Sequence, residues 1–330
     1  MKVLSFLCAL LVSCSLMPVT IRLLARFKIQ DVPNARSSHQ SVTIRGTGIA
    51  VALGCFGGLI TNWESSSSAL LIIFVSVWFG LIGLIDDLRS LSAKIRLGGQ
   101  VIGSLLPILV LSSFHTLQFS LVVVICGSFG LVAYVNAFNF MDGINFISIL
   151  QTVVVAFSLV IAGNVLHSSL VTIGAASVLG AVLGFLPFNG IVVQTFMGDI
   201  GSYFLGAWLS ILAILAFQNG SGLVFLVSLG VIYFSDTGTT LAKRIIRKEK
   251  WMVAHRQHEY QRMIDMGYSH FFVSIYVTFF SALSCLFGIF SLRASAVGSL
   301  LALMSLVPIS VVYLNGHRYH FLTRWSKGQS

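Results

Sequence analysis

The chain alternates from end to end between long apolar runs and short polar turns. Its 330 residues contain eleven such runs. A membrane-spanning helix needs about 20 mainly apolar residues, and a soluble domain has roughly 25% charged residues, whereas this chain has 9%. The pattern predicts an all-α, polytopic integral membrane protein. The predicted spans are 3–24, 46–62, 69–85, 98–114, 117–137, 145–163, 167–187, 201–217, 221–241, 270–291 and 296–314.

The charged residues fall on one side of these predicted spans. Eighteen of the 20 Lys and Arg residues lie there, and so do nine of the ten carboxylates. Because positive charge marks cytoplasmic loops, we expect the N-terminus outside and the C-terminus in the cytoplasm. The opposite loops are very short, so residues 1–330 are expected to form a single transmembrane domain with a long cytoplasmic loop at 242–269.

The net charge of +10 has two interpretations. Nucleic-acid binding is one, but the charges lie beside predicted spans, which favours anionic lipid headgroups and anionic substrates. The apolar N-terminal run resembles a signal peptide. Since it continues to Leu24 and basic residues follow it, we interpret it as an uncleaved first span.

Two consecutive carboxylates, Asp86 and Asp87, end the third predicted span. They are either a solvated helix end or part of a site. Adjacent helical residues point about 100° apart, so the two side chains are expected to have different roles rather than to bind one ion together.

A polar stripe ends the fifth predicted span. Asn136, Asn139 and Asp142 recur every three residues, and Gly143 follows them. Helical residues at this spacing lie on neighbouring parts of one face. The stripe is either a helix-end cap or a binding surface, and its amide and carboxylate groups favour a binding site.

Further polar residues flank the eighth and ninth predicted spans. Asp199 lies between Gly198 and Gly201, in a segment that begins with Phe196 and precedes a helix expected to begin near Ser202. Glycines allow the backbone to approach a ligand closely, and a helix N-terminus attracts anions. Asp236, near the end of the ninth span, is either a helix-end polar residue or a supporting partner of the site.

The long loop carries His255, Arg256 and His258 close together. Such side chains are directional donors for phosphate oxygens. Histidines as zinc ligands are the alternative, but the loop lacks a third close ligand of the right type.

Together these groups predict a specific chemistry. Carboxylates repel phosphates but hold Mg²⁺, which bridges phosphate oxygens, while basic donors neutralise the remaining charge. A substrate at the membrane boundary is then expected to be a lipid phosphate. Mn²⁺ is a possible substitute for Mg²⁺.

The ordered set of motifs resembles the polyprenyl-phosphate N-acetylhexosamine-1-phosphate transferase superfamily. Its pieces run in family order between residues 31 and 262. They are Asp31–His39, Asp86-Asp87, Asn136–Gly143, Phe196–Ser202 and His255–Arg262.

The resemblance implies a transferase that uses a UDP-N-acetylhexosamine and undecaprenyl phosphate and releases UMP. It implies that the domain is catalytic and that loop 242–269 recognises substrate. Asp199 and Asp87 would be metal ligands, and Asp86, Asp87 and Asp199 the catalytic residues. The implied substrate contacts are Asn136, Asn139, Asp142, Asn189, Phe196 (stacked on uracil), His255, Arg256 and His258.

The chain departs from the family at two places. The peptidoglycan translocase has three consecutive histidines where this chain reads His255-Arg256-Gln257-His258. This departure favours the branch that starts O-antigen chains, with a 6-deoxy sugar of the FucNAc or QuiNAc type, or GlcNAc, as the transferred group. The second departure is the stretch Ile44–Gly48, where a Pro-Arg-Gly-Gly-Gly-like sequence is usual.

The resemblance also sets the expected location and partners. It implies a multi-pass protein of the bacterial inner membrane with its active site on the cytoplasmic face, no nucleic-acid partner and a possible homodimer. The alternative from another class is a transporter of an anionic metabolite. A transporter would place ionisable residues near the bilayer midplane, in broken helices, so the one-sided charge disfavours it. A catalytically dead scaffold of the same fold is disfavoured by the complete set of aspartates.

Overall fold

The structure is a computed structural model that describes residues 2–33, 42–61, 67–113, 121–249 and 255–318. Within these residues, eight helices are long and apolar enough to span a membrane, and a bent pair makes a possible ninth. The prediction of an all-α, multi-pass membrane protein is therefore confirmed. The helices are α1 (Lys2–Arg26), α2 (Gly48–Ile60), α3 (Ser67–Arg89), α4 (Ala93–Ser113), α5 (Leu121–Met141), α6 (Ile147–Val165), α7 (Ser169–Phe185), α8 (Gly198–Gln218), α9 (Gly222–Ser228), α10 (Val231–Ile246), α11 (Glu259–Asp265), α12 (His270–Ser291) and α13 (Ala296–Tyr313), with 3-10 turns at Leu186–Phe188 and Gly316–Arg318.

The count of eleven spans and the orientation stay predictions. Every predicted span coincides with helix, but α2 has only 13 residues, about 20 Å at 1.5 Å per residue, which is shorter than the roughly 30 Å of a bilayer core. The side chains of α4 are described only as far as Leu105. Residues 34–39 of the predicted motif Asp31–His39 and residues 250–254 of the predicted loop 242–269 lie outside the described residues.

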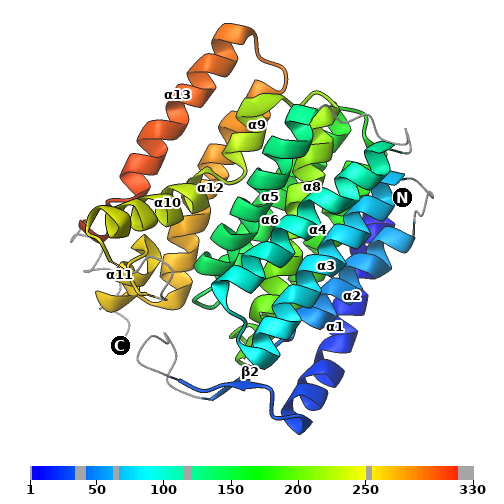
Figure 1. Cartoon of the computed structure of the whole chain (residues 1–330), viewed down its shortest axis with the longest axis vertical. Helices are drawn as coiled ribbons and strands as arrows, with labels where there is room; N and C mark the ends of the chain where they lie inside the picture. Colours follow the sequence, from blue (N-terminus) through cyan, green and yellow to red (C-terminus); the bar gives the residue numbers. More distant parts are fainter. Residues whose placement is uncertain (1, 34–41, 62–66, 114–120, 250–254, 319–330) are drawn as a thin grey trace.

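Helix α8 is the centre of the bundle (Figure 1). Over an apolar stretch of 18 residues, 94% of α8 is buried inside the protein. The helix packs against α2, α3, α5 and α6. Two helix crossings at its N-terminal end depend on glycine. A Cβ on Gly48 would lie 2.3 Å from the Gly201 Cα, and one on Gly83 would lie 2.2 Å from the Asp199 carbonyl oxygen. The N-terminal turn of α8 is thus held close to α2 and α3.

The ninth predicted span is broken. Helices α9 and α10 meet at a bend of 65°, so the predicted span 221–241 consists of two helices rather than one. Figure 1 shows α10 lying across the direction of the neighbouring helices, beside α11. The bend brings the polar C-terminal half of α10, with Asp236, to the end of the bundle where α11 lies.

A small three-stranded sheet, absent from the prediction, lies at the same end of the bundle. Its strands are β1 (Gln30–Asp31), β2 (Thr43–Arg45) and β3 (Thr195–Phe196). The order is β1-β2-β3, with β1 antiparallel and β3 parallel to β2. Strands of two or three residues give too short an alternation to recognise in sequence. The sheet pairs Arg45 with Phe196 and so brings Arg45 to the start of α8.

Candidate active site

The site begins with a cap on helix α8. The Asp87 carboxylate accepts the backbone N–H groups of Asp199 and Ile200, each at 3.0 Å. The first N–H groups of a helix have no partner within it, and a carboxylate there also interacts favourably with the helix dipole. Gly198, with φ +75°, precedes the cap, and a Cβ on it would lie 2.6 Å from an Asp87 oxygen. Only glycine fits this approach without strain.

Arg45 joins the two aspartates of this cap. Its Nε lies 2.6 Å from Asp87 Oδ1 and its Nη2 lies 2.8 Å from Asp199 Oδ1. Burial disfavours the guanidinium charge, but the neighbouring carboxylates of Asp199 and Asp87 outweigh it and raise the pKa of Arg45. The β2–β3 pairing fixes the position of Arg45, and Thr47 secures the turn after it by donating its hydroxyl to the Phe196 carbonyl at 2.9 Å.

Asp199 is held by a second helix. The Asn139 amide on α5 donates to Asp199 Oδ1 and to the Ser202 hydroxyl, both at 2.9 Å. The structure therefore brings together Asp87, Asn139 and Asp199, three of the residues that the sequence predicted. Asp199 lies in the first turn of α8 because the helix begins at Gly198, four residues before the predicted start.

Asp86 completes the acidic group from the other side. It accepts the Leu91 backbone N–H at 2.7 Å and Arg96 Nη1 at 2.7 Å. Its carboxylate is also close enough to that of Asp199 for the two to interact. As predicted from their divergent directions, Asp86 and Asp87 have different partners. We call Asp86, Asp87, Asp199, Asn139, Arg45 and Arg96 the acidic cluster.

The polar stripe on α5 divides among three partners. Asn139 reaches the acidic cluster, whereas Asn136 donates to Gln100 on α4 at 2.7 Å. Asp142 accepts the Ser148 hydroxyl at 2.6 Å, and burial raises its pKa to about 7. At 100° per residue, a three-residue spacing drifts by about 60° per step, so the three side chains face different neighbours.

Asn189 and Phe196 have structural contacts in this state. Asn189 accepts the Phe146 N–H at 2.7 Å and donates to the Thr195 carbonyl at 2.8 Å, so it fixes the segment that leads to β3. Phe196 is partly buried in β3, and its carbonyl accepts N–H groups from Gly46 and Thr47. The predicted nucleotide contacts of these two side chains stay predictions.

The loop before α11 docks on the end of α5. The rings of His258 and Phe140 stack with centroids 6.2 Å apart, and the Tyr260 hydroxyl donates to the Phe140 carbonyl at 3.0 Å. A Cβ on Gly143 would lie 2.2 Å from that hydroxyl. Gly143, just past the end of α5, therefore makes room for Tyr260. Phe140 adjoins Asn139, so the loop contacts α5 next to the acidic cluster.

The three basic residues of the loop have different environments. His258 Nδ1 lies 3.0 Å from Asp236 Oδ1. His255 packs against the His258 ring at 5.0 Å, and burial, followed by the neighbouring His258 and Arg244, lowers its pKa to about 4. Arg256 Nη2 pairs with Asp265 Oδ1 at 2.7 Å. A phosphate recruited by Arg256 would thus compete with an ion pair already formed.

The predicted Mg²⁺ would need oxygen donors of the kind that the acidic cluster contains. Within the described residues, no three His, Cys, Asp or Glu side chains are grouped as a ready metal site. Mg²⁺, however, is commonly held by one or two carboxylates together with substrate phosphates and water. The carboxylates of Asp86 and Asp199 are near enough to interact, and a bound cation would stabilise both as anions. These donors fit Mg²⁺, whereas both oxygens of Asp87 already cap α8, so its role as a ligand stays a prediction.

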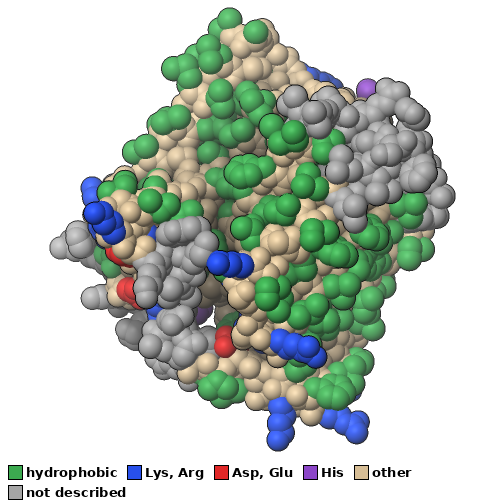
Figure 2. Space-filling model, viewed as in Figure 1, with side chains coloured by type: hydrophobic (Ala, Val, Ile, Leu, Met, Phe, Trp, Pro, Cys, Tyr) green, Lys and Arg blue, Asp and Glu red, His purple; other side chains and the backbone are tan. Residues whose placement is uncertain are grey.

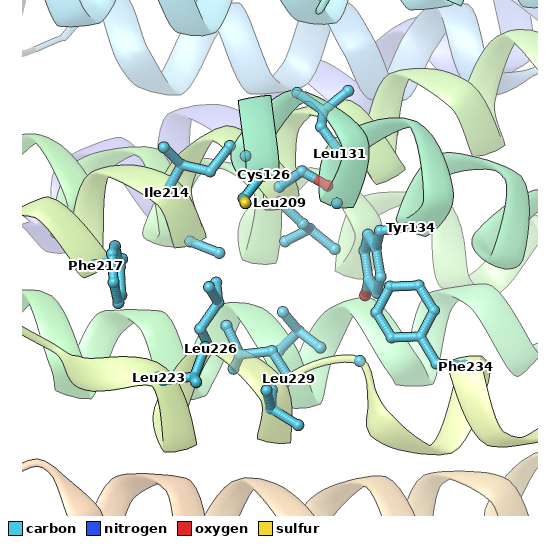
Figure 3. A pocket seen from close by; sticks show the side chains of 17 residues that line it. Cys126, Leu131, Tyr134, Leu209, Ile214, Phe217, Leu223, Leu226, Leu229 and Phe234 are labelled. Atoms are coloured by element: carbon cyan, nitrogen blue, oxygen red, sulfur yellow. The ribbon is translucent and has the colours of Figure 1, made fainter. Parts of the chain in front are cut away.

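An apolar cavity of about 420 Å³ lies along α5, between α8 and the bent pair α9–α10 (Figure 3). Its α5 lining runs from Cys126 to Tyr134, and Asn139 of the acidic cluster lies five residues further along the same helix. Figure 2 shows Lys and Arg side chains gathered mainly near the end of the molecule that carries β2, α10 and α11 in Figure 1. The polar site and the apolar cavity are therefore connected by one helix.

These features define a class: a multi-pass membrane protein with an acidic cluster and basic donors at one end of its helix bundle. The family described as Glycosyl transferase family 4 matches residues 69–217 of the chain. This segment contains Asp86, Asp87, Asn139 and Asp199, although Arg45 and loop 242–269 lie outside it.

Three relatives extend the match. A Bacillus subtilis protein named probable undecaprenyl-phosphate N-acetylglucosaminyl 1-phosphate transferase is 27% identical over 289 residues, 81% of this chain and 78% of its own length. Phospho-N-acetylmuramoyl-pentapeptide-transferases are 28% identical in Streptococcus mutans and 30% identical in Enterococcus hirae. These two matches cover 64% and 58% of this chain and 66% and 64% of those proteins. These matches support the polyprenyl-phosphate N-acetylhexosamine-1-phosphate transferase superfamily that the motifs resemble.

Proposed function

We propose that the protein transfers N-acetylhexosamine-1-phosphate from a UDP-sugar to undecaprenyl phosphate, releasing UMP. The observation that carries the proposal is the acidic cluster, in which Asp199 is fixed by Asn139 and Arg45 at the N-terminus of α8. In the reaction, an oxygen of the lipid phosphate attacks the β-phosphorus of the UDP-sugar. The bond from that phosphorus to the bridging oxygen breaks, and UMP leaves with the electron pair.

The residues of the cluster have separate roles in this proposal. Asp199 and Asp86 would hold Mg²⁺, and the charge of the bound ion would offset that of the diphosphate. Asp87 fixes the first turn of α8 and positions Asp199 through its backbone N–H. Arg45 and Arg96 offset the charge of the carboxylates with which they pair. Their guanidinium groups would also donate hydrogen bonds to phosphate oxygens of a substrate bound at the cluster.

The apolar cavity supports the choice of a polyprenyl acceptor. Its lining is almost entirely aliphatic and aromatic side chains of α5, α8, α9 and α10 (Figure 3). Five residues of helix separate Tyr134 at its edge from Asn139, about 7.5 Å along the axis. An isoprenoid chain in the cavity would therefore place its phosphate toward the acidic cluster, at the boundary between apolar and polar surface.

The donor sugar and the pathway are finer parts of the proposal. The loop sequence His255-Arg256-Gln257-His258 supports a 6-deoxy-N-acetylhexosamine or GlcNAc, and a role in starting O-antigen or another cell-envelope polysaccharide. The name of the B. subtilis relative specifies N-acetylglucosamine, which supports GlcNAc as the first donor to test. We further propose that the protein lies in the bacterial inner membrane with this site on the cytoplasmic face.

The transporter alternative has one supporting observation, the break between α9 and α10, since broken helices occur at transporter sites. Asp236 on α10, however, is paired with His258, Glu259 and Tyr313, and all three relatives are named as transferases. The transferase is therefore the better supported function.

The test is nucleotide release by the purified protein with undecaprenyl phosphate, Mg²⁺ and a panel of UDP-N-acetylhexosamines that includes 6-deoxy forms. The expected product is UMP with one sugar, lost on addition of EDTA and restored by excess Mg²⁺. Asp199→Asn is expected to reach the membrane and bind detergent micelles normally but to release no UMP. Wild-type turnover by Asp199→Asn would contradict the metal assignment.

A further inference from the structure

We propose that Asp236 and Tyr313 are positioning residues that hold the His255–His258 loop against α5 in the geometry needed to bind the sugar-nucleotide donor. The proposal rests on the proposed function and names the part of the fold that sets donor affinity. Neither residue contacts the acidic cluster, so both act through the loop.

Asp236 is a fully buried carboxylate whose oxygens converge on the loop. Its side chain is 0% exposed. Oδ1 lies 3.0 Å from His258 Nδ1 and accepts the Glu259 N–H at 3.1 Å, and Oδ2 accepts the same N–H at 3.1 Å. A buried carboxylate without such donors would be strongly destabilising. The Asp236 carboxylate accepts a hydrogen bond from His258 Nδ1. In a neutral His258 ring the proton therefore lies on Nδ1, and Nε2 is the acceptor.

The last helix completes this anchor. The Tyr313 hydroxyl, at the C-terminal end of α13, donates to Asp236 Oδ2 at 2.7 Å. Glu259, the first residue of α11, accepts the His317 N–H at 2.6 Å and lies 2.8 Å from His317 Nδ1. Hydrogen bonds thus link His258, through Asp236, and Glu259, directly, to the C-terminal region, which is more than 50 residues away along the chain.

The anchored loop borders the proposed donor site. The His258 ring stacks with the Phe140 and Tyr260 rings, with centroids 6.2 and 5.9 Å apart, and Phe140 adjoins Asn139, which donates a hydrogen bond to Asp199. Release of Asp236 would therefore free the ring of His258 and the segment bearing His255 and Arg256. The acceptor cavity is lined by α5, α6, α8, α9 and α10 up to Phe234 and includes neither Tyr313 nor the loop. The anchor should affect the donor and spare the acceptor.

The experiment compares Tyr313→Phe and Asp236→Asn with a matched control. Tyr268→Phe also removes a buried hydroxyl near α11, but that hydroxyl has no hydrogen-bond partner among the described residues. We expect KM for the UDP-sugar to rise about tenfold or more in both Tyr313→Phe and Asp236→Asn, since the loss of one hydrogen bond to a charged group changes an affinity by roughly ten- to a hundredfold. KM for undecaprenyl phosphate should change by less than about twofold in both variants, which is smaller than the effect of one lost hydrogen bond. Tyr268→Phe should match the wild type in both KM values.

A merely structural role gives a different result. Loss of folded protein would lower kcat with both KM values unchanged, and that outcome in Tyr313→Phe and Asp236→Asn would overturn the proposal. Equal rises in both KM values, or no change in either, would also overturn it.

Hydrogen exchange in the peptide 255–262 separates this proposal from the proposed function. Exchange there should be faster in Tyr313→Phe than in the wild type and unchanged in Tyr268→Phe, whatever reaction the protein catalyses. If the wild type released no UMP, the proposed function would fail while the anchor could still stand. If the wild type were active and exchange in Tyr313→Phe unchanged, the anchor alone would fail.

Discussion

At the scale of single residues, the acidic cluster depends on how each carboxylate is paired. Asp87 is a cap, Asp199 is held by an amide and a guanidinium, and Asp86 is paired with Arg96. The sequence predicted that Asp86 and Asp87 differ, from the angle between adjacent helical residues. It did not predict Arg45, because that residue reaches the site through a strand pairing between segments 150 residues apart, which local periodicity does not contain.

Arg45 tests the geometry of the cluster. Arg45→Lys keeps the charge but replaces a planar fork by a point charge, so one of the contacts to Asp87 and Asp199 is lost. We expect kcat/KM to fall about 10- to 100-fold, since a hydrogen bond to a charged group is worth about 1.5–3 kcal/mol. Arg89→Lys, at the exposed end of α3, is the matched control and should keep full activity. Equal activity of the two variants would exclude a bridging role for Arg45.

His255 predicts a pH dependence of stability. Its folded-state pKa of about 4 lies below the ordinary value of 6.5, so the folded protein resists protonation there more than the unfolded chain does. Its contribution to stability is complete above pH 6.5 and is lost as the pH falls toward 4. We expect the thermal midpoint of the wild type to drop between pH 7.5 and 5 by more than that of His255→Gln. Parallel curves for the two proteins would contradict the lowered pKa.

At the scale of elements, the sequence predicted the helices well and their breaks poorly. Long apolar runs identify helices because a membrane requires them, whereas the 65° bend at Gly230 and the short β1–β3 sheet depend on tertiary contacts. The stripe Asn136, Asn139 and Asp142 was correctly assigned to one helix, but helical drift and the packing of α4, α6 and α8 around α5 separate its members. Only Asn139 faces Asp199.

The contact between α5 and α11 can be tested by a double-mutant comparison. A Cβ in Gly143→Ala would lie 2.2 Å from the Tyr260 hydroxyl oxygen, so the loop must move away from Phe140. We expect kcat/KM for the donor to fall about tenfold or more, as buried overpacking costs about 1–3 kcal/mol. In the Tyr260→Phe background, which lacks that oxygen, the same change should cost clearly less. Additive losses would show that the two residues are not in contact in the active protein.

At the scale of the whole molecule, one polar end and an otherwise apolar bundle determine how the protein sits in a membrane. The sequence predicted this asymmetry from charge alone, and Figure 2 shows it as Lys and Arg side chains near one end. The orientation is a prediction from the distribution of Lys and Arg. The apolar cavity was not predicted, because its lining includes residues of α9 and α10 on both sides of the break between these helices.

Cysteine labelling tests that orientation. In a background without the five native cysteines, Arg293→Cys in the turn between α12 and α13 should react with an impermeant maleimide in intact cells. Lys248→Cys, which follows α10, should react only after permeabilisation. Both residues are exposed, so access decides the outcome. The reverse pattern would overturn the orientation and place the acidic cluster on the outer face.

The central claim is that the protein moves a phosphosugar rather than a sugar. It is tested most directly with a UDP-N-acetylhexosamine labelled with ³²P at the β-phosphorus and undecaprenyl phosphate as acceptor. We predict that the label enters the lipid fraction in step with the release of unlabelled UMP, and that Asp199→Asn abolishes both. Label retained in water-soluble UDP while the sugar reaches the lipid would mean ordinary glycosyl transfer and would contradict the account.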